Sequence, residues 1–140
     1  MRTTRVLFLC ARNTARSQMA EGLLRARAGD RCEVYSAGNE PSGVHPLAIE
    51  AMLEIGVDIS GQRSKSTREV LGQRFGYVIT LCNRAREKCL IFPGAVQRLE
   101  WPLDDPAAAV GNEADRLAVF RRIRDQIETR VLAFINDAAL

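Results

Sequence analysis

Short apolar runs alternate with longer amphipathic stretches along this chain. The run at residues 6–9 is too short for a helix and is flanked by charge, which predicts a buried strand. Later runs at 77–81 and 96–100 predict two more strands. The stretch 31–38 alternates apolar and polar residues until small residues stop it, and it also predicts a strand.

Apolar residues at helical spacing separate these strands. Helices are predicted from residue 16 onward and over residues 46–56, 64–73 and 112–139. In the short helix we expect Val70 and Leu71 to face inward, and in the last helix we expect Arg124 to face solvent. Strands that alternate with helices predict an α/β fold. We expect one domain over residues 1–140, with a four-stranded parallel sheet and helices on both faces.

The junction between the first strand and the first helix carries the strongest chemical signal. Cys10 opens this loop and Arg16 closes it, with five residues between them. Unpaired backbone N–H groups and the helix dipole make such a junction suitable for an anion, and arginine adds a bidentate fork. We expect these residues to surround the anion: Ala11, Arg12, Asn13, Thr14, Ala15, Arg16 and Ser17.

The same positive field favours the thiolate form of Cys10, which would then be a nucleophile beside a bound tetrahedral oxyanion. Ser17 can donate a hydrogen bond to the sulfur, and Asn13 tolerates the left-handed backbone that turns amides inward. A chance match remains the alternative, because arginine is abundant in this chain and it has four cysteines.

Composition narrows the class of protein. The chain has 140 residues, 46% hydrophobic and 26% charged, with a net charge of +3, as is ordinary for a globular domain. Its arginines are scattered rather than clustered with aromatics, which argues against nucleic acid. No membrane span or signal peptide is expected. We therefore expect a cytoplasmic monomer whose cysteines are reduced thiols with chemistry to perform.

Two further cysteines follow the predicted strand at 77–81. Cys82 ends that strand, so it would share with Cys10 the edge where the carboxyl ends of parallel strands meet. The charged segment 83–88 lacks apolar positions, and we expect it to be weakly held and mobile. Its length is wrong for a zinc knuckle but allows Cys89 to fold back onto Cys82. Two separate buried thiols are the alternative.

Other reactive side chains have simpler interpretations. Cys32 is predicted to be a small buried residue, and His45, the only histidine, to cap or pack against a helix. No metal site or cofactor is expected. Asp105 lies in a rigid loop after the only tryptophan, where a carboxyl group near the sheet edge could protonate a leaving oxygen. An ordinary Asp-Asp-Pro turn is an equally good explanation.

Several motifs together resemble one family. They are the Cys10–Ser17 loop, Ser36-Ala37-Gly38, the Gly56–Ser60 turn, Cys82, Cys89 and Asp104-Asp105-Pro106. This set is similar to the thioredoxin-coupled arsenate reductases, which are related to the low-molecular-weight protein tyrosine phosphatases. The resemblance extends over essentially the whole chain, and the two later cysteines distinguish the reductases from the phosphatases.

The resemblance implies a fold like that of the small phosphatases and a mechanism of three cysteines. Cys10 would attack arsenate held by the loop and Arg16, while Asp105 protonates the departing oxygen. Cys82 would then attack Cys10 and release arsenite. Cys89 would attack Cys82 in turn, and thioredoxin would reduce the resulting Cys82–Cys89 disulfide.

The chain departs from the family pattern in one respect. Some members bind potassium through residues matching Asn13, Glu21 and Ser36 and through an aspartate, where this chain has Lys65. We hypothesise that the Lys65 ammonium replaces the metal charge. Two other functions are considered: a phosphatase acting on phosphotyrosine or a small ester with the same loop, and a non-enzymatic oxyanion or redox sensor.

Overall fold

A parallel four-stranded sheet forms the centre of the protein. The computed structural model describes residues 3–89 and 91–140, so Met1, Arg2 and Leu90 lie outside the description. The strands are β1 (Thr4–Leu9), β2 (Cys32–Ala37), β3 (Phe75–Thr80) and β4 (Ala95–Glu100). They pair in the order β2-β1-β3-β4, and all three pairings are parallel. The prediction of a four-stranded parallel sheet is confirmed.

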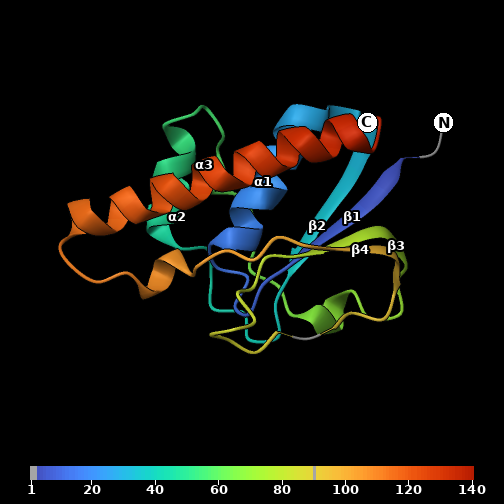
Figure 1. Ribbon diagram of the computed structural model, residues 1–140, viewed down its shortest axis with the longest axis horizontal. Helices are drawn as coiled ribbons and strands as arrows, with labels where there is room; N and C mark the ends of the chain where they lie inside the picture. Colours follow the sequence, from blue (N-terminus) through green and yellow to red (C-terminus); the bar gives the residue numbers. More distant parts are fainter. Residues whose placement is uncertain (1–2, 90) are drawn as a thin grey trace.

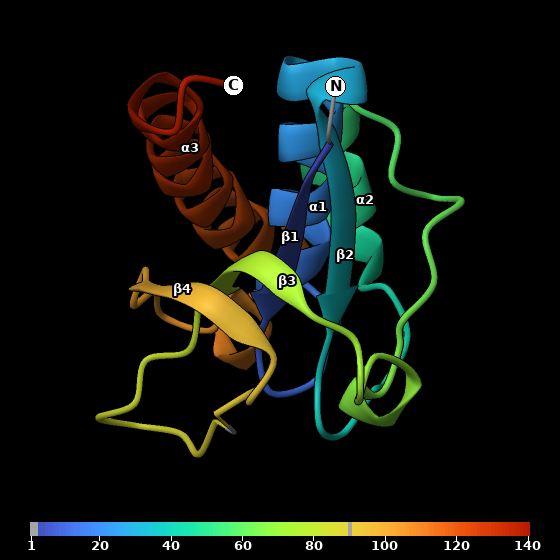
Figure 2. The ribbon, with the colours of Figure 1, turned by 90° about the vertical axis from the view of Figure 1, so that its right-hand side faces the viewer.

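Helices were expected on both faces of the sheet, but the three α-helices pack together on one face, and the opposite face is covered by the segments beside η2 (Thr67–Glu69) and before β4. The α-helices are α1 (Arg16–Ala28), α2 (Pro46–Leu53) and α3 (Glu113–Asp137), and the other 3₁₀ turns are η1 (Gly29–Arg31) and η3 (Pro106–Ala108). The long helix α3 runs above α1 in Figure 1, and Figure 2 shows all three helices on the same side of the sheet. In the described part of the chain, no helix combines the length and apolar character needed to cross a membrane.

Strand β1 is apolar throughout because both of its faces are buried. Val6 and Phe8 belong to the large core that the three helices cover. Leu7 and Leu9 point to the opposite face, into a smaller core that contains Phe75 and side chains from the segments beside η2 and before β4. This two-sided burial explains why the strand reads as a continuous apolar run rather than an alternating one.

The predicted helix over residues 64–73 is wrong in extent. The structure forms only the 3₁₀ turn η2 there, with the Ser66 side chain as its cap. The reason is tertiary: Gly38 donates to the Lys65 carbonyl, and its own carbonyl accepts from the Thr67 amide, which holds this backbone extended beside the end of β2. Val70 is buried as predicted, whereas Leu71 is 54% exposed.

Arg124 on α3 is also placed differently from the prediction. Its side chain is buried, with 8% exposure, rather than facing solvent. The guanidinium donates to the Ala51 carbonyl at 2.8 Å and to Glu54 at 2.8 Å. It thereby fastens α3 to the end of α2, a contact that helical spacing along α3 does not reveal.

Because every strand runs in the same direction, four loops meet at the carboxyl edge of the sheet. The loop after β1 begins with Cys10, and the segment after β3 begins with Leu81 and Cys82. The Leu81 amide donates to the Leu9 carbonyl at 2.8 Å, which carries the β1–β3 pairing to the last residue before the two cysteines. The expectation that Cys10 and Cys82 share one edge is met.

Candidate active site

The loop from Cys10 to Arg16 curls so that its carbonyls point away from its centre. Three of them accept backbone hydrogen bonds from outside the loop: Ala11 from Glu40 (3.0 Å), Arg12 from Ser42 (3.2 Å) and Thr14 from His45 (2.8 Å). Asn13 has φ +48°, the left-handed conformation predicted for it. With the carbonyls turned outward, the amides between them turn inward.

These inward amides have the properties of an anion site. Within residues 3–89 and 91–140, no amide of residues 11–15 donates a hydrogen bond to a protein acceptor. Helix α1 follows with Ala15 at its N-cap and without a capping side chain, so the positive end of its dipole is uncompensated. The loop lines a cavity of about 320 Å³ to which Cys10, Arg16 and Asp105 also contribute.

Gly38, just after β2, allows the loop to close. A Cβ atom on this residue would lie 2.7 Å from the carbonyl oxygens of Cys10 and Ala11 and from the amide nitrogen of Asn13. All three neighbours are backbone atoms, so none can swing aside. The small residue that ends the predicted second strand is therefore required for close packing of backbone on backbone.

Cys10 is held by a short buried network. Its Sγ lies 2.7 Å from the Ser17 Oγ, and the Asn13 Nδ2 donates to that same hydroxyl at 2.8 Å. Asn13 and Ser17 are completely buried, so they lie behind the cavity rather than in its wall. The side-chain oxygen of Asn13 accepts from Gln18 (2.9 Å) and from the Lys65 amide (2.7 Å), which fixes its orientation.

Arg16 is buried to 3% exposure at the first turn of α1. Its Nη1 donates to the Leu103 carbonyl at 3.0 Å and lies 3.4 Å from the Leu81 carbonyl. Burial alone would lower the pKa of Arg16, but the carboxylate of Glu87 and the charges of Cys10 and Asp105 outweigh it and raise the pKa. The guanidinium is thus a fixed cation that faces the cavity beside Cys10.

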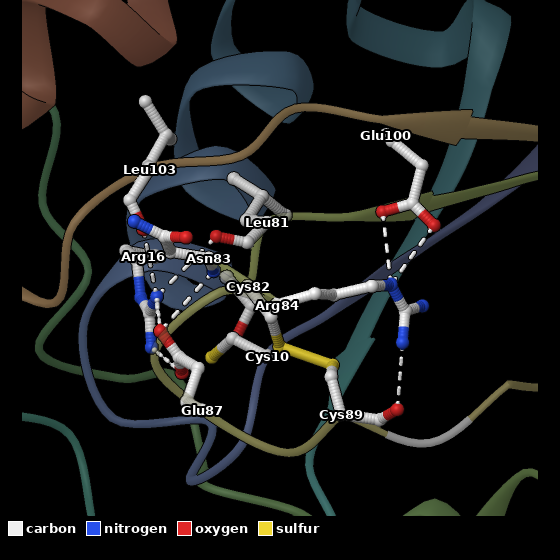
Figure 3. The surroundings of a disulfide bond; sticks show 11 residues. Cys10, Arg16, Leu81, Cys82, Asn83, Arg84, Glu87, Cys89, Glu100 and Leu103 are labelled. Carbon is white, nitrogen blue, oxygen red and sulfur yellow. Dashed lines mark hydrogen bonds and ion pairs between the residues drawn. A yellow bond between two sulfur atoms is a disulfide. The ribbon is translucent and has the colours of Figure 1, made fainter.

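Cys82 and Cys89 form a disulfide at the same edge of the sheet, with their Cα atoms 6.2 Å apart. Figure 3 shows the Cys10 thiol next to this bond, on the Cys82 side. Cys82 is completely buried, whereas Cys89 is partly exposed. The outer sulfur is therefore the one that a second protein could reach.

The segment 83–88 between these cysteines contains a turn and no helix. Arg84 pairs with Glu100 at 3.1 Å, and the Asn83 side chain donates to Asp104 at 3.0 Å. Glu87 forms a bidentate pair with Arg16, at 2.6 and 2.7 Å. Within the segment, the Arg86 and Glu87 amides donate to the Asn83 carbonyl at 2.9 and 3.0 Å, and the mobility of the segment stays a prediction.

Asp105 lies at the mouth of the cavity. Its carboxylate accepts from the Ala107 amide at 3.0 Å and caps η3, so the turn-forming role weighed from the sequence is present. Asp105 also lines the same cavity as Cys10, Arg16 and the anion loop. Its neighbour Asp104 points to the exposed surface instead and binds Asn83.

The remaining candidates have structural positions. The Nδ1 of His45 accepts from the Leu47 amide at 3.1 Å and caps α2, and its ring lies 4.7 Å from that of Phe120. Cys32 is buried at the start of β2, as expected for a packing residue. Among the residues that the structure describes, no group of three or more His, Cys, Asp or Glu side chains is arranged to hold a metal.

Lys65 lies close to the buried carboxylate of Glu21, with an Nζ–Oε1 distance of 3.6 Å. Glu21 also accepts a hydrogen bond from Ser36 and pairs with Arg25 at 2.7 Å. The Lys65 Nζ donates to the Arg63 carbonyl at 2.6 Å. An ammonium group therefore sits beside the residues that match the potassium ligands of some relatives.

Sequence reasoning missed Glu87 as a site residue, although it placed Cys10, Arg16, Cys82, Cys89 and Asp105 at one edge. Glu87 is the only acidic residue between the two cysteines of the disulfide. The available signal was a single carboxylate in a segment that pairing of Cys82 with Cys89 would hold near Arg16. The interpretation of the whole segment as weakly held left no role for this carboxylate.

Comparison with known proteins places the chain in a family. The low molecular weight phosphotyrosine protein phosphatase family matches residues 5–140, and the chain belongs to it. An arsenate reductase from Halalkalibacterium halodurans is 46% identical over 129 residues, which cover 92% of this chain and 93% of that protein.

Two solved structures have the same fold. An arsenate reductase in a phosphate-binding state superposes with a TM-score of 0.83 at 36% identity, covering 96% of this chain and 98% of the other. A thioredoxin-dependent arsenate reductase from Corynebacterium glutamicum has a TM-score of 0.73 at 32% identity, covering 96% of this chain and 61% of the other. These similarities extend over the whole sheet and its helices.

Proposed function

We propose that this protein is an enzyme that reduces arsenate to arsenite through a thiol–disulfide relay of three cysteines. The observation that carries the proposal is the Cys82–Cys89 disulfide beside the Cys10 loop. An anion loop with a cysteine and an arginine is sufficient for a phosphatase, which needs only water after the first displacement. A redox-active cysteine pair at the same edge is needed only for reduction, and the relatives named arsenate reductase support that choice.

The first step is substitution at arsenic. The loop amides and Arg16 hold arsenate with its arsenic facing the Cys10 thiolate, which Ser17 stabilises through their hydrogen bond. The sulfur forms a bond to arsenic(V), and one oxygen leaves as water after Asp105 supplies a proton. No electrons have been transferred to arsenic at this point.

The second and third steps transfer the electrons and renew the nucleophile. The Cys82 thiolate attacks the Cys10 sulfur, so a sulfur–sulfur bond forms while the sulfur–arsenic bond breaks and its electron pair goes to arsenic, which leaves as arsenite. The Cys89 thiolate then attacks Cys82, the Cys82–Cys89 disulfide forms, and Cys10 is released as thiolate. The sum is arsenate plus two thiols giving arsenite, one disulfide and water.

A dithiol protein must reduce the disulfide before the next turnover, and we propose thioredoxin for this step. The thioredoxin-dependent relative supports the choice, and the partly exposed Cys89 is the sulfur that such a partner would attack first. Because the relay consumes reduced thiols, we propose that the protein acts in the cytoplasm, and as a monomer.

The test is arsenate-dependent oxidation of NADPH in the presence of thioredoxin and thioredoxin reductase. Wild type should turn over, whereas Cys10→Ser, Cys82→Ser and Cys89→Ser should each abolish turnover because each removes one sulfur of the relay. Cys32→Ser is the matched control, since Cys32 is a free cysteine outside the site, and it should retain turnover. Equal activity of wild type and Cys82→Ser would contradict the proposal.

A phosphatase is the second candidate, and the family match to phosphotyrosine phosphatases favours it. Arsenate and phosphate share shape and charge, so the loop binds both. We expect weak hydrolysis of p-nitrophenyl phosphate that survives Cys82→Ser and is lost in Cys10→Ser. If Cys82→Ser removed phosphatase and arsenate turnover equally, the relay role of Cys82 would be wrong.

A further inference from the structure

In this disulfide form, the carboxylate of Glu87 occupies the fork of Arg16. The two oxygens of Glu87 accept from Nη1 and Nη2 of Arg16 at 2.6 and 2.7 Å, and Figure 3 shows the two planar groups face to face beside Cys10. The ion pair is shielded from solvent, with 3% exposure of the Arg16 side chain and 18% of the Glu87 side chain. This is the bidentate geometry in which arginine binds an oxyanion.

Protein acceptors take up the terminal nitrogens of Arg16 in this form. Nη1 also donates to the Leu103 carbonyl at 3.0 Å, so its hydrogens are divided between that carbonyl and Glu87. Glu87 lines the same cavity as Cys10 and the anion loop. An oxyanion bound to the loop amides would meet the carboxylate both in space and in charge.

Glu87 is charged when it lies there. Burial alone would raise the pKa of Glu87, but the hydrogen bonds and positive charge of Arg16 outweigh it and lower the pKa below the ordinary value for glutamate. The Asn83 amide donates a further hydrogen bond to the carboxylate at 3.2 Å. The Glu87 carboxylate is therefore negatively charged and is bound by the same kind of donors that would bind a substrate oxyanion.

The disulfide determines where this carboxylate can lie. Glu87 is inside the loop that the Cys82–Cys89 bond closes, two residues before Cys89. Apart from that bond, the segment 83–88 is attached to the rest of the protein by the shielded Glu87–Arg16 pair and by exposed polar contacts such as Arg84–Glu100, and the exposed contacts contribute little each. The position of Glu87 is thus tied to the redox state of the two cysteines.

We propose that Glu87 is a positioning residue that closes the oxyanion site in the oxidised enzyme and leaves it when the disulfide is reduced. The inference rests on the proposed function, because it assigns a further step to the same site. Its consequence is order in the cycle: the oxidised enzyme does not bind a new arsenate before its disulfide has been reduced. In the oxidised enzyme Arg16 also keeps a compensated charge.

Oxyanion binding and reduction of the Cys82–Cys89 disulfide must influence each other reciprocally. If an oxyanion binds the reduced enzyme more tightly than the oxidised one, the oxyanion must shift the thiol–disulfide equilibrium toward the reduced form. Removing the carboxylate from position 87 must weaken this effect. The proposal therefore predicts a measurable coupling between anion and disulfide and not merely a local contact.

Inorganic phosphate is the probe, because it has the shape and charge of arsenate and is not reduced. Calorimetric titration is performed on the reduced and the disulfide forms of wild type, Glu87→Gln and Glu100→Gln. We expect wild type to bind phosphate at least about tenfold more tightly when reduced, and Glu87→Gln to bind it similarly in both forms. Glu100→Gln, which removes another carboxylate paired with an arginine near the disulfide, should behave like wild type.

The outcomes separate this inference from the function on which it rests. If oxidised Glu87→Gln bound phosphate as weakly as oxidised wild type while the reduced forms bound it well, the role of Glu87 would be overturned and the anion site would stand. If Glu100→Gln strengthened phosphate binding to the oxidised form as much as Glu87→Gln, the cause would be general loosening of the segment 83–88, and the inference would also be wrong. If reduced wild type bound no phosphate, the oxyanion site itself, and with it the proposed function, would be wrong.

Discussion

The Ser17 hydroxyl lies 2.7 Å from the Cys10 sulfur and accepts a hydrogen bond from Asn13 at 2.8 Å. Since Asn13 uses a lone pair of the hydroxyl oxygen, the Ser17 hydrogen is available to the sulfur. A buried hydroxyl in this position stabilises a thiolate more than a thiol, because hydrogen bonds to charged groups are the stronger ones.

Ser17→Ala should therefore slow reactions of the Cys10 sulfur. We expect alkylation by iodoacetamide at neutral pH to slow about tenfold, since one hydrogen bond to a charged group contributes about 1.5–3 kcal/mol. The rate is measured in a background of Cys32→Ser, Cys82→Ser and Cys89→Ser, so that one thiol reports. An unchanged rate in this background would show that Ser17 only fills space.

Asp105→Asn should separate proton donation from turn formation. Asn and Asp are equivalent caps, so the free energy of unfolding should change by about 0.5 kcal/mol or less, because the bond to the Ala107 amide is retained. The amide cannot donate the proton that the departing oxygen needs, and arsenate turnover should fall about a hundredfold. Asp104→Asn is the control, since Asp104 faces Asn83, and it should lose little activity.

His45 should make the fold less stable in mild acid. Burial, and then the positive charge of Arg116, lower its pKa from the ordinary value of 6.5, with partial opposition from Asp105. The folded protein therefore binds this proton less readily than the unfolded chain. The stability contributed by neutral His45 is present above about pH 6.5 and is lost as the pH falls through the folded-state value, because protonation removes the acceptor for the Leu47 amide.

Urea unfolding at about pH 7.5 and about pH 5 measures this loss. His45→Asn retains a capping oxygen without the titration, so its stability should fall less over the same interval. Glu54 adds little to the slope there: hydrogen bonds from Arg121 and Arg124 lower its pKa from 4.5 to about 2, so its contribution is lost mainly below about pH 4.5. If the free energy of unfolding fell equally with pH in wild type and His45→Asn, the loss of stability could not be due to His45.

The Lys65 ammonium, 3.6 Å from Glu21, should make a potassium ion unnecessary. We expect potassium to raise the melting temperature no more than sodium at equal ionic strength. Lys65→Asp introduces the aspartate that the family resemblance implies at this position and should create a preference for potassium. A clear preference already present in wild type would show that the ammonium does not replace the metal charge.

The sequence anticipated the catalytic edge of the sheet well, for a local reason. An apolar run followed by Cys10, small polar residues and an amphipathic helix has one compact solution, in which the loop amides converge. Parallel strands then bring Cys82 to the same edge, because the helical connections between β1 and β2 and between β2 and β3 return the chain so that these strands run in the same direction. The left-handed Asn13 and the cap at His45 are also local properties of residue type.

Long-range pairs were beyond such reasoning. The segment at 64–73 has helical composition, yet its backbone pairs with Gly38 and only one 3₁₀ turn forms. Helical spacing predicts Arg124 on the exposed face of α3, but in the structure its guanidinium donates to the carbonyl of Ala51. In each case a partner remote along the chain outweighs a local preference that is worth less than 1 kcal/mol per residue.

By itself, the sequence predicted the residues of the site: Cys10 as the nucleophile, Arg16 as the cation that faces it, and Cys82 with Cys89 as the sulfurs that could form a pair. Those choices follow from residue type and short spacing, which act through neighbours along the backbone. Only the tertiary structure decided that Glu87 meets Arg16 across 71 residues. Two charged groups that far apart in sequence are brought together by the packing of the whole sheet edge, which no local pattern specifies.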